Sequence, residues 1–365
     1  MFHLKKISLN QLVCLVILTQ IGVHALSIPY SESRRSGYDS WMSILLGGVF
    51  AQLVIIMIYQ LGKRYPNQSL QQYIVSIIGK PLGILVNILF AAYCAESTLM
   101  VIVSYADVMN RWVLFETPWF VLIGLSVFIV AFVAASSLRS IATLTQSFTG
   151  MFFVCLVIIC ISGYGKGDWR HFFPIGTHGI VAILKDSVPS LWAYAGYDLL
   201  LYAFPFVACR KKSQILLAMS VANGITTLIY FVISVIVTYN FSENQLNLIS
   251  EPMVFILRKF RWPVVQSLDI VFMTIWLSVT TITAFVYLFL SARYLAFVGR
   301  KENHRHVLIV WLIASVVFGI GSFFADRQSL FSFIDFHNKT TFLFTSALPV
   351  FLLIVSFVRG KVAKE

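Results

Sequence analysis

Residues 11–30 read QLVCLVILTQIGVHALSIPY, and residues 188–208 read VPSLWAYAGYDLLLYAFPFVA. Each stretch is apolar and about 20 residues long, the length that crosses a bilayer as a helix. Each also carries a glycine in its middle, Gly22 or Gly196, and a proline near its end. Backbone groups freed by such an interruption persist inside a bilayer only where they line a cavity or are buried in protein. The two stretches therefore predict interrupted transmembrane helices, and they decide the fold.

Composition places the rest of the chain in a membrane as well. Of the 365 residues, 59% are hydrophobic and 12% are charged, whereas soluble domains carry roughly 25% charged residues. A span needs about 20 apolar residues, so the chain has room for about ten transmembrane helices in one membrane domain, residues 1–365. We predict an all-α polytopic membrane protein. Its spans are expected at 11–30, 41–61, 82–105, 119–136, 143–163, 188–208, 214–239, 265–291, 307–324 and 341–358.

The net charge of +12 is explained by topology. With a cytoplasmic N-terminus, the cytoplasmic segments collect most of the Lys and Arg, such as Lys63 and Arg64. The outer loops then hold most of the acids, including Glu32 and Asp335. The positive-inside rule therefore places both termini in the cytoplasm. Because the basic residues are divided among short segments instead of forming one face, the pattern argues against nucleic-acid binding.

The N-terminal stretch has a second interpretation. Lys5 and Lys6, an apolar run and then Val23-His24-Ala25 are also the pattern of a signal peptide with a small-residue cleavage site. Apolar character resumes through Ile28, and the stretch has a counterpart later in the chain. We therefore favour a transmembrane span.

That counterpart is the interrupted sixth span. The two stretches are five spans apart, and an odd offset places them in opposite orientations across the membrane. This is the pattern of a five-plus-five inverted repeat with discontinuous helices 1 and 6. The repeats would cover approximately 8–165 and 185–360. The alternative is chance, because Gly and Pro are common in membrane helices and the halves differ too much in sequence to decide.

The two interruptions are the predicted ligand site. Freed helix N-termini favour carboxylates, freed carbonyl groups favour ammonium groups or cations, and an α-amino acid presents both charges. Small residues would let a ligand approach the backbone, although they also allow close helix packing. The candidate ligand-binding residues of the first break are Gly22, Val23, His24, Ala25 and Ser27, and those of the sixth are Tyr194, Ala195, Gly196, Tyr197 and Asp198.

Three acids lie clearly within the predicted spans, and such groups are costly in a membrane. Asp198 follows Gly196 closely and is a candidate for ligand or ion contact. Glu96 lies in the middle of its span, where it would face the same cavity or be a buried carboxyl bonded to neighbouring helices. Asp269 lies near the outer end of its span, which favours a solvated interfacial position.

Two further groups are candidates. His24 is the only histidine within a predicted span, and it is either a packing residue or a cavity residue that titrates between about pH 5 and 8. In span eight, Trp276, Thr280 and Thr283 recur at helical spacing, so they would face the bundle centre together. Their alternative is interhelical hydrogen bonding.

Motifs of enzymes and cofactor sites do not occur in the sequence. It contains no G-x-S-x-G, no G-x-x-x-x-G-K-[ST] and no H-E-x-x-H, which are patterns of hydrolases, nucleotide-binding loops and zinc proteases. We therefore expect no catalytic activity, no cofactor and no metal site.

Several short motifs, in this order and spacing, resemble one family. They are Gly22 to Pro29, Arg64-Tyr65-Pro66 with Ser69-Leu70, Trp169-Arg170 with Pro174, Gly196-x-Asp198 with Pro205 and the basic run to Lys212, and Trp276. Over nearly its whole length the chain resembles the endospore germination permeases, the B-subunit type of the nutrient germinant receptors of spore-forming bacteria. His24 departs from the small residues that this family tends to have at the first break, so the resemblance does not fix the ligand.

The resemblance implies a LeuT-like, amino-acid–polyamine–cation type fold in the inner spore membrane. It also implies a receptor subunit that senses a small nutrient, commonly an amino acid, and works with a large A-type subunit and a C-type lipoprotein. Without the resemblance, broken helices around a midplane site favour the alternative, an ion-coupled secondary amino-acid transporter.

Overall fold

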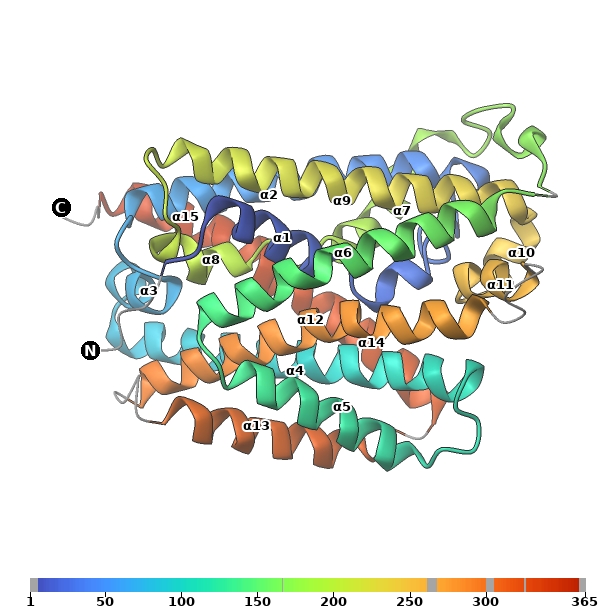
Figure 1. Ribbon diagram of the computed structural model, residues 1–365. Helices are drawn as coiled ribbons and strands as arrows, with labels where there is room; N and C mark the ends of the chain where they lie inside the picture. The colour runs from blue at the N-terminus through green and yellow to red at the C-terminus, as the bar shows by residue number, and fades with distance from the viewer. Residues whose placement is uncertain (1–5, 166, 261–267, 300–304, 325, 361–365) are drawn as a thin grey trace.

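The chain is a bundle of α-helices. The computed structural model describes residues 6–165, 167–260, 268–299, 305–324 and 326–360 (Figure 1). Within these ranges there is no β-strand, only an isolated bridge between Ile7 and Val207. The helices are α1 Leu9–Gln20, α2 Ser40–Arg64, α3 Leu70–Ile78, α4 Lys80–Trp112, α5 Trp119–Ala134, α6 Leu138–Gly163, α7 Gly179–Ala193, α8 Leu199–Ala203, α9 Ser213–Asn240, α10 Glu243–Leu248, α11 Pro252–Lys259, α12 Leu268–Val298, α13 His306–Gly321, α14 Arg327–Thr341 and α15 Leu348–Val358.

Short turns of other helix types complete the chain. Four are 3₁₀ turns and one is a π-helical turn that joins α14 to α15. They are η1 Val23–Leu26, η2 Gly37–Asp39, η3 Trp169–Phe172, η4 Phe204–Phe206 and the π-helical η5 Phe342–Ala347.

The predicted polytopic all-α fold is confirmed. Among the described residues, six helical segments are long and apolar enough to cross a membrane by length and composition. Shorter apolar helices, α1, α5 and α13, match the predicted first, fourth and ninth spans, and α7 with α8 forms the interrupted sixth. Residues 265–267 of the eighth span lie outside the described residues. The extents of the two repeats stay a prediction.

The tenth span differs from its prediction. It begins at Arg327, not at residue 341, and runs through α14, η5 and α15 to Val358. Asp335 is therefore a helix residue and not part of an outer loop, and His24 is not the only histidine within a span because His337 lies here too. Polar side chains between residues 335 and 340 lower the local hydropathy. Hydropathy therefore does not identify the first half of this span.

The first span occupies the centre of the bundle. Helix α1 packs against α6, α9 and α12. The long helix α12 is buried along most of its length and packs against α4, α5, α6 and α13. Helices α2 and α9 pack against each other on the opposite side of α1 (Figure 1). The discontinuous spans are thus enclosed by continuous helices.

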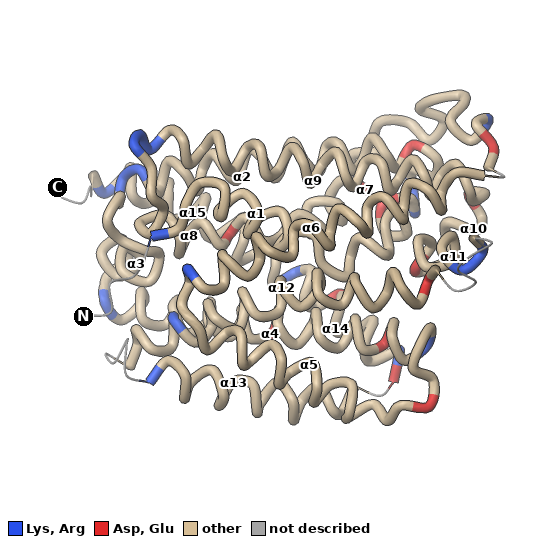
Figure 2. Tube along the Cα trace, in the orientation of Figure 1, with Lys and Arg blue, Asp and Glu red and all other residues tan. Residues whose placement is uncertain are grey.

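The outer surface suits a bilayer. Helix α5 exposes Phe120, Leu125, Phe128 and Phe132, and α13 exposes a similar apolar face. A helix that is apolar on all sides fits the hydrocarbon region. Lys and Arg gather at the end of the bundle that holds α3 and the first and last described residues, while Asp and Glu gather near α10 and α11 (Figure 2). The protein is a multi-pass membrane protein.

Local sequence explains where the broken helices begin and end. Helix α1 starts with a capping box in which Ser8 and Gln11 bond each other's backbone N–H groups, and it ends before Gly22, whose ψ of −144° is not helical. Helix α7 ends at Ala193 and α8 starts after Asp198. Between them Gly196 has φ +128°, a conformation that only glycine adopts without strain.

Candidate functional site

The two breaks lie directly against each other. The Gln20 side chain donates from Nε2 to the Tyr194 carbonyl at 3.0 Å. The single O–H group of Tyr230, from α9, is shared between the Gln20 carbonyl at 2.8 Å and the Ala193 carbonyl at 3.1 Å. At Gly196 a Cβ atom would lie 2.9 Å from the Gln20 backbone nitrogen. Glycine is therefore what allows the two backbones to approach.

Side chains of the protein bond the carbonyl groups that the first break frees. Thr283 of α12 donates from Oγ1 to the Thr19 carbonyl at 3.0 Å. Thr226 of α9 donates to Gln20 Oε1 at 2.8 Å, which fixes the amide that bonds the second break. Buried backbone groups must be satisfied in a bilayer, and the hydroxyl groups of Thr283 and Tyr230 satisfy the Thr19 and Gln20 carbonyls.

Asp198 is buried behind the breaks. Its Oδ1 accepts hydrogen bonds from the Gly196 N–H at 2.9 Å and from the Tyr287 hydroxyl at 3.0 Å. Its Oδ2 is buried and has no hydrogen-bond partner in the described part of the chain. Tyr287 lines a cavity that lies beside the first break, and Asp198 does not line it. Asp198 therefore holds Tyr287 in place from behind the cavity wall.

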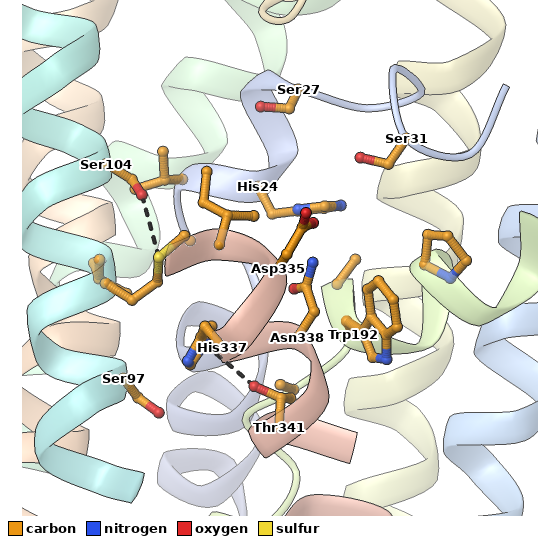
Figure 3. A pocket seen from close by; sticks show the side chains of 18 of the residues that line it. His24, Ser27, Ser31, Ser97, Ser104, Trp192, Asp335, His337, Asn338 and Thr341 are labelled. Atoms are coloured by element: carbon orange, nitrogen blue, oxygen red, sulfur yellow. Dashed lines mark hydrogen bonds between the residues drawn. The ribbon is translucent and has the colours of Figure 1, made fainter. Parts of the chain in front are cut away.

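A cavity of about 600 Å³ lies beside the first break. Its walls are the segment from Thr19 to Arg35, the face of α4 from Tyr93 to Val108, Trp192 at the end of α7, and α14. Helix α12 contributes Thr283 and Tyr287 to the wall, and Ser250 and Glu251 also line the cavity. Figure 3 shows His24, Trp192, Asp335 and His337 directed into this space. The volume suits a small molecule.

Some predicted site residues line the cavity. They come from both breaks and from α12. They are Gly22, Val23, His24, Ser27, Ala195 and Thr283.

The other predicted residues do not line the cavity, and several of their side chains pack inside the bundle instead. Tyr194 donates to the Ile44 carbonyl, Tyr197 bonds Ser346 of η5, and Thr280 bonds its own helix. Trp276 stacks on Phe272 with ring centroids 5.2 Å apart. Outside the lining are Ala25, Tyr194, Gly196, Tyr197, Asp198, Glu96, Trp276 and Thr280.

Glu96 lies behind the wall and supports it. It accepts hydrogen bonds from Thr340 at 2.9 Å and pairs with His337 Nδ1 at 3.1 Å. His337 lines the cavity and also bonds Thr341 through Nε2 at 3.2 Å. This matches the alternative interpretation of Glu96 as a carboxyl bonded to a neighbouring helix, here α14.

His24 is held by a buried acid. Its Nε2 lies 2.9 Å from Glu32 Oε1, and the Glu32 side chain is 1% exposed. Glu32 belongs to the turns that follow the first break. The imidazole thus reaches the cavity with one side already paired.

Helix α14 supplies several cavity residues that sequence reasoning missed, and others come from α4, Trp192 and Tyr287. Ile334, His337, Asn338 and Thr341 line the cavity at spacings of three and four, which is the period of one helix face. Asp335 lies beside them. The same period in the sequence was the signal that could have found them, had the polar stretch been considered as part of a span.

The comparisons with known proteins agree with this architecture. The family model described as spore germination protein matches residues 6–326. Spore germination protein GerQB of Bacillus cereus is 24% identical over 266 residues, 72% of each chain. Spore germination protein YndE of Bacillus subtilis (strain 168) is 20% identical over 96% of each chain.

Solved structures share the fold. The crystal structure of MhsT in complex with L-phenylalanine superposes with a TM-score of 0.70 at 12% identity, and covers 96% of this chain and 89% of that one. A manganese transporter of Eremococcus coleocola gives a TM-score of 0.53 at 14% identity, over 94% of this chain and 78% of that one. The predicted LeuT-like fold with discontinuous helices 1 and 6 is thereby confirmed. By the extent of its match to the family model, the chain belongs to the spore germination protein family.

Proposed function

We propose that this protein is the membrane subunit of a spore germinant receptor that senses a small nutrient in the cavity beside the first break. The observation that carries the proposal is this cavity, built around two interrupted helices in a member of the spore germination family. Occupancy would favour one arrangement of the bundle over another and so signal germination. The signal would pass to a large A-type subunit and a C-type lipoprotein in the inner spore membrane, with both termini of this chain cytoplasmic. The proposal involves no catalytic step.

A second candidate is an ion-coupled secondary amino-acid transporter. It is favoured by the likeness to MhsT, whose structure contains L-phenylalanine. Against it stands the state of the break carbonyls, since cations in such folds bind to unwound backbone carbonyls. Here the carbonyls of Thr19 and Gln20 already accept hydrogen bonds from Thr283 and Tyr230. We therefore favour the receptor.

Deletion of the gene tests the proposed receptor function. Spores that lack this chain are expected to lose their germination response to at least one nutrient, and a wild-type copy should restore it. Germination is followed by the fall in optical density over a panel of amino acids and sugars. Retained responses to other nutrients show that the spores are intact. A mutant that responds normally to every nutrient contradicts the receptor, and gradient-dependent amino-acid uptake into vesicles that contain this chain alone supports the transporter.

A cavity-filling substitution tests the site. Ser104 lies on α4 in the cavity wall, so Ser104→Trp should occupy ligand space and raise the half-maximal nutrient concentration about tenfold or more, the effect of an overlap of roughly 1–3 kcal/mol. The control is Ser315→Trp, because Ser315 is exposed on the outer face of α13. Equal responses of the two variants, at equal protein levels, would argue against this cavity as the nutrient site.

A further inference from the structure

Asp198 is a buried acid without a positive partner. It is the residue before α8 and is 1% exposed. Among the residues that the structure describes, no Lys, Arg or His side chain forms an ion pair with it. A buried charge without a partner is among the most costly groups in a membrane protein. The carboxyl group of Asp198 therefore requires either a proton or a bound cation.

The titratable side chains that interact electrostatically with Asp198 are all tyrosines or a cysteine. They are Tyr93 and Cys94 of α4, Tyr197 of the second break, and Tyr287 and Tyr294 of α12. Tyrosine and cysteine are neutral or negative in every protonation state. None of the five can therefore balance the charge of a carboxylate.

The other elements nearby direct their charged groups elsewhere. Helix α2 packs against α8, but its Lys63 is exposed and its Arg64 donates to the Ser356 carbonyl at 3.0 Å. Helix α3, which also packs against α8, carries Tyr73 as its titratable residue. His337 of α14 stacks on Tyr93 with ring centroids 6.3 Å apart, and it pairs with Glu96. These elements leave Asp198 without a cation.

The hydrogen bonds of Asp198 distinguish its two oxygen atoms. Oδ1 accepts both of them, from the Gly196 N–H at 2.9 Å and from the Tyr287 hydroxyl at 3.0 Å. Oδ2 accepts none from the described part of the chain. A carboxylate shares its charge between two equivalent oxygens, whereas a carboxylic acid has one accepting carbonyl oxygen and one oxygen that carries the proton. The observed arrangement is that of the acid.

A metal ion fits this position less well than a proton. Hard cations collect several oxygen ligands, and the Thr19 and Gln20 carbonyls of the neighbouring break already accept hydrogen bonds from side chains. The described residues also contain no group of three or more His, Cys, Asp or Glu side chains that could hold a metal ion. A proton needs a single oxygen atom, which Oδ2 provides.

We propose that Asp198 is a proton-binding site that controls the wall of the nutrient cavity. The proton resides on Oδ2, while Oδ1 holds Gly196 of the second break and Tyr287 of α12. Tyr287 connects this site to the cavity, because it lines the cavity and packs edge-on against Tyr93, another lining residue, with ring centroids 5.9 Å apart. This inference rests on the proposed nutrient-sensing function and adds the proton to it as a second ligand.

Loss of the proton would disturb this wall. An ionised Asp198 would have a charge on Oδ2 inside the bundle, and water or a cation from the cavity would reach it only if Tyr287 moved. The arrangement with Tyr287 in the wall therefore binds one proton more than a rearranged wall does. By linkage, rising pH disfavours the described arrangement, and a nutrient that binds against this wall binds more weakly.

The proton itself is tested on the purified protein, without a nutrient. Infrared spectra at about pH 6 should contain the carbonyl band of a neutral carboxylic acid, which Asp198→Asn should lack. Tyr287→Phe removes one of the two hydrogen bonds to Oδ1 and should shift this band to higher frequency. The control is Asp269→Asn, because Asp269 is partly exposed in the first turn of α12, and it should leave the band unchanged.

The infrared result decides the proton site. A band that Asp198→Asn removes and Tyr287→Phe shifts supports it. Absence of such a band from the wild type throughout about pH 5 to 8 overturns it. If Asp198→Asn does not yield folded protein, the pH titration of the wild-type band and the shift in Tyr287→Phe give the same decision.

Control of the cavity wall is tested in spores. The half-maximal nutrient concentration of the wild type should rise about tenfold from about pH 6 to 8, whereas that of Asp198→Asn, which stays uncharged, should change less than about twofold. A nutrient whose response survives deletion of this gene corrects for the effect of pH on later steps. A wild-type response that does not depend on pH overturns the control of the wall.

The two histidines of the wall are the competing explanation. A pH dependence that persists in Asp198→Asn and disappears in His24→Gln or His337→Gln assigns it to a histidine and overturns the role of Asp198. Failure of the proposed function is distinguishable from both results. Gene deletion would then change no nutrient response, while the infrared band of the purified protein would be unaffected.

Discussion

Replacement of Gly196 by alanine is expected to abolish the nutrient response and to destabilise the protein. Gly196 has φ +128°, a conformation that costs other residues about 1–3 kcal/mol. An added Cβ would also lie 2.9 Å from the Gln20 nitrogen and 3.0 Å from the Thr19 carbonyl carbon. These are backbone atoms, which cannot move aside as a flexible side chain would. The overlap adds about 1–3 kcal/mol and pushes the two breaks apart.

The measurements are germination of spores and the thermal unfolding midpoint of the purified protein. Gly224→Ala is the control, because a Cβ at Gly224 in α9 would meet no atom within 4 Å. That change should leave the response intact and raise stability by up to about 1 kcal/mol, the helix preference of alanine over glycine. A Gly196→Ala protein with a normal midpoint and a normal response would show that the breaks do not need this close approach.

Removal of the Tyr230 hydroxyl group is expected to have the second-largest effect on stability and on the nutrient response. Tyr230→Phe removes the one O–H group that the carbonyls of both breaks share, at 2.8 Å to Gln20 and 3.1 Å to Ala193. After this substitution the Gln20 carbonyl would still accept a hydrogen bond from the Gly22 N–H at 3.0 Å. The Ala193 carbonyl would have no other hydrogen-bond donor from outside α7 among the described residues. An unsatisfied buried group costs about 1–3 kcal/mol, and lipid supplies no replacement. We expect lower stability and a weaker nutrient response.

The control comes from the same helix. The Tyr239 hydroxyl donates to the Gly165 carbonyl at 3.1 Å at an exposed position, where water can replace it. Tyr239→Phe should therefore cost less than about 1 kcal/mol. Thermal unfolding of both variants in one detergent gives the comparison. If they unfold at the same temperature, the hydroxyl of Tyr230 does not hold the breaks together.

Hydropathy predicted most of the fold because apolar length and the position of Gly196 are read directly from sequence. The second break was placed at 194–198, and the structure has no helix between Ala193 and Leu199. Helix α14, the first half of the tenth span, was missed because several of its polar residues face a cavity instead of lipid. A hydropathy rule assumes a lipid environment on every side of a span, and this helix has protein and a cavity on one side.

The site was less predictable because side-chain directions depend on the backbone of the breaks. Helical periodicity does not hold between residues 194 and 198, so the inward direction of the Tyr194 and Tyr197 rings could not be foreseen. In α12 the spacing grouped Trp276 with Thr283, yet seven residues separate them by about 10 Å along the helix. Only Thr283 reaches the depth of the cavity.

The two interrupted spans are joined at three depths. Near the basic end, the Ile7 N–H donates to the Phe206 carbonyl at 2.9 Å and the Ala208 N–H donates to the Ile7 carbonyl at 2.8 Å. The amide contact between the breaks is the second connection, and the Arg35–Asp186 ion pair is the third. These three connections couple the two interrupted spans along their length. A displacement of one interrupted span at the cavity would therefore displace the other span as well.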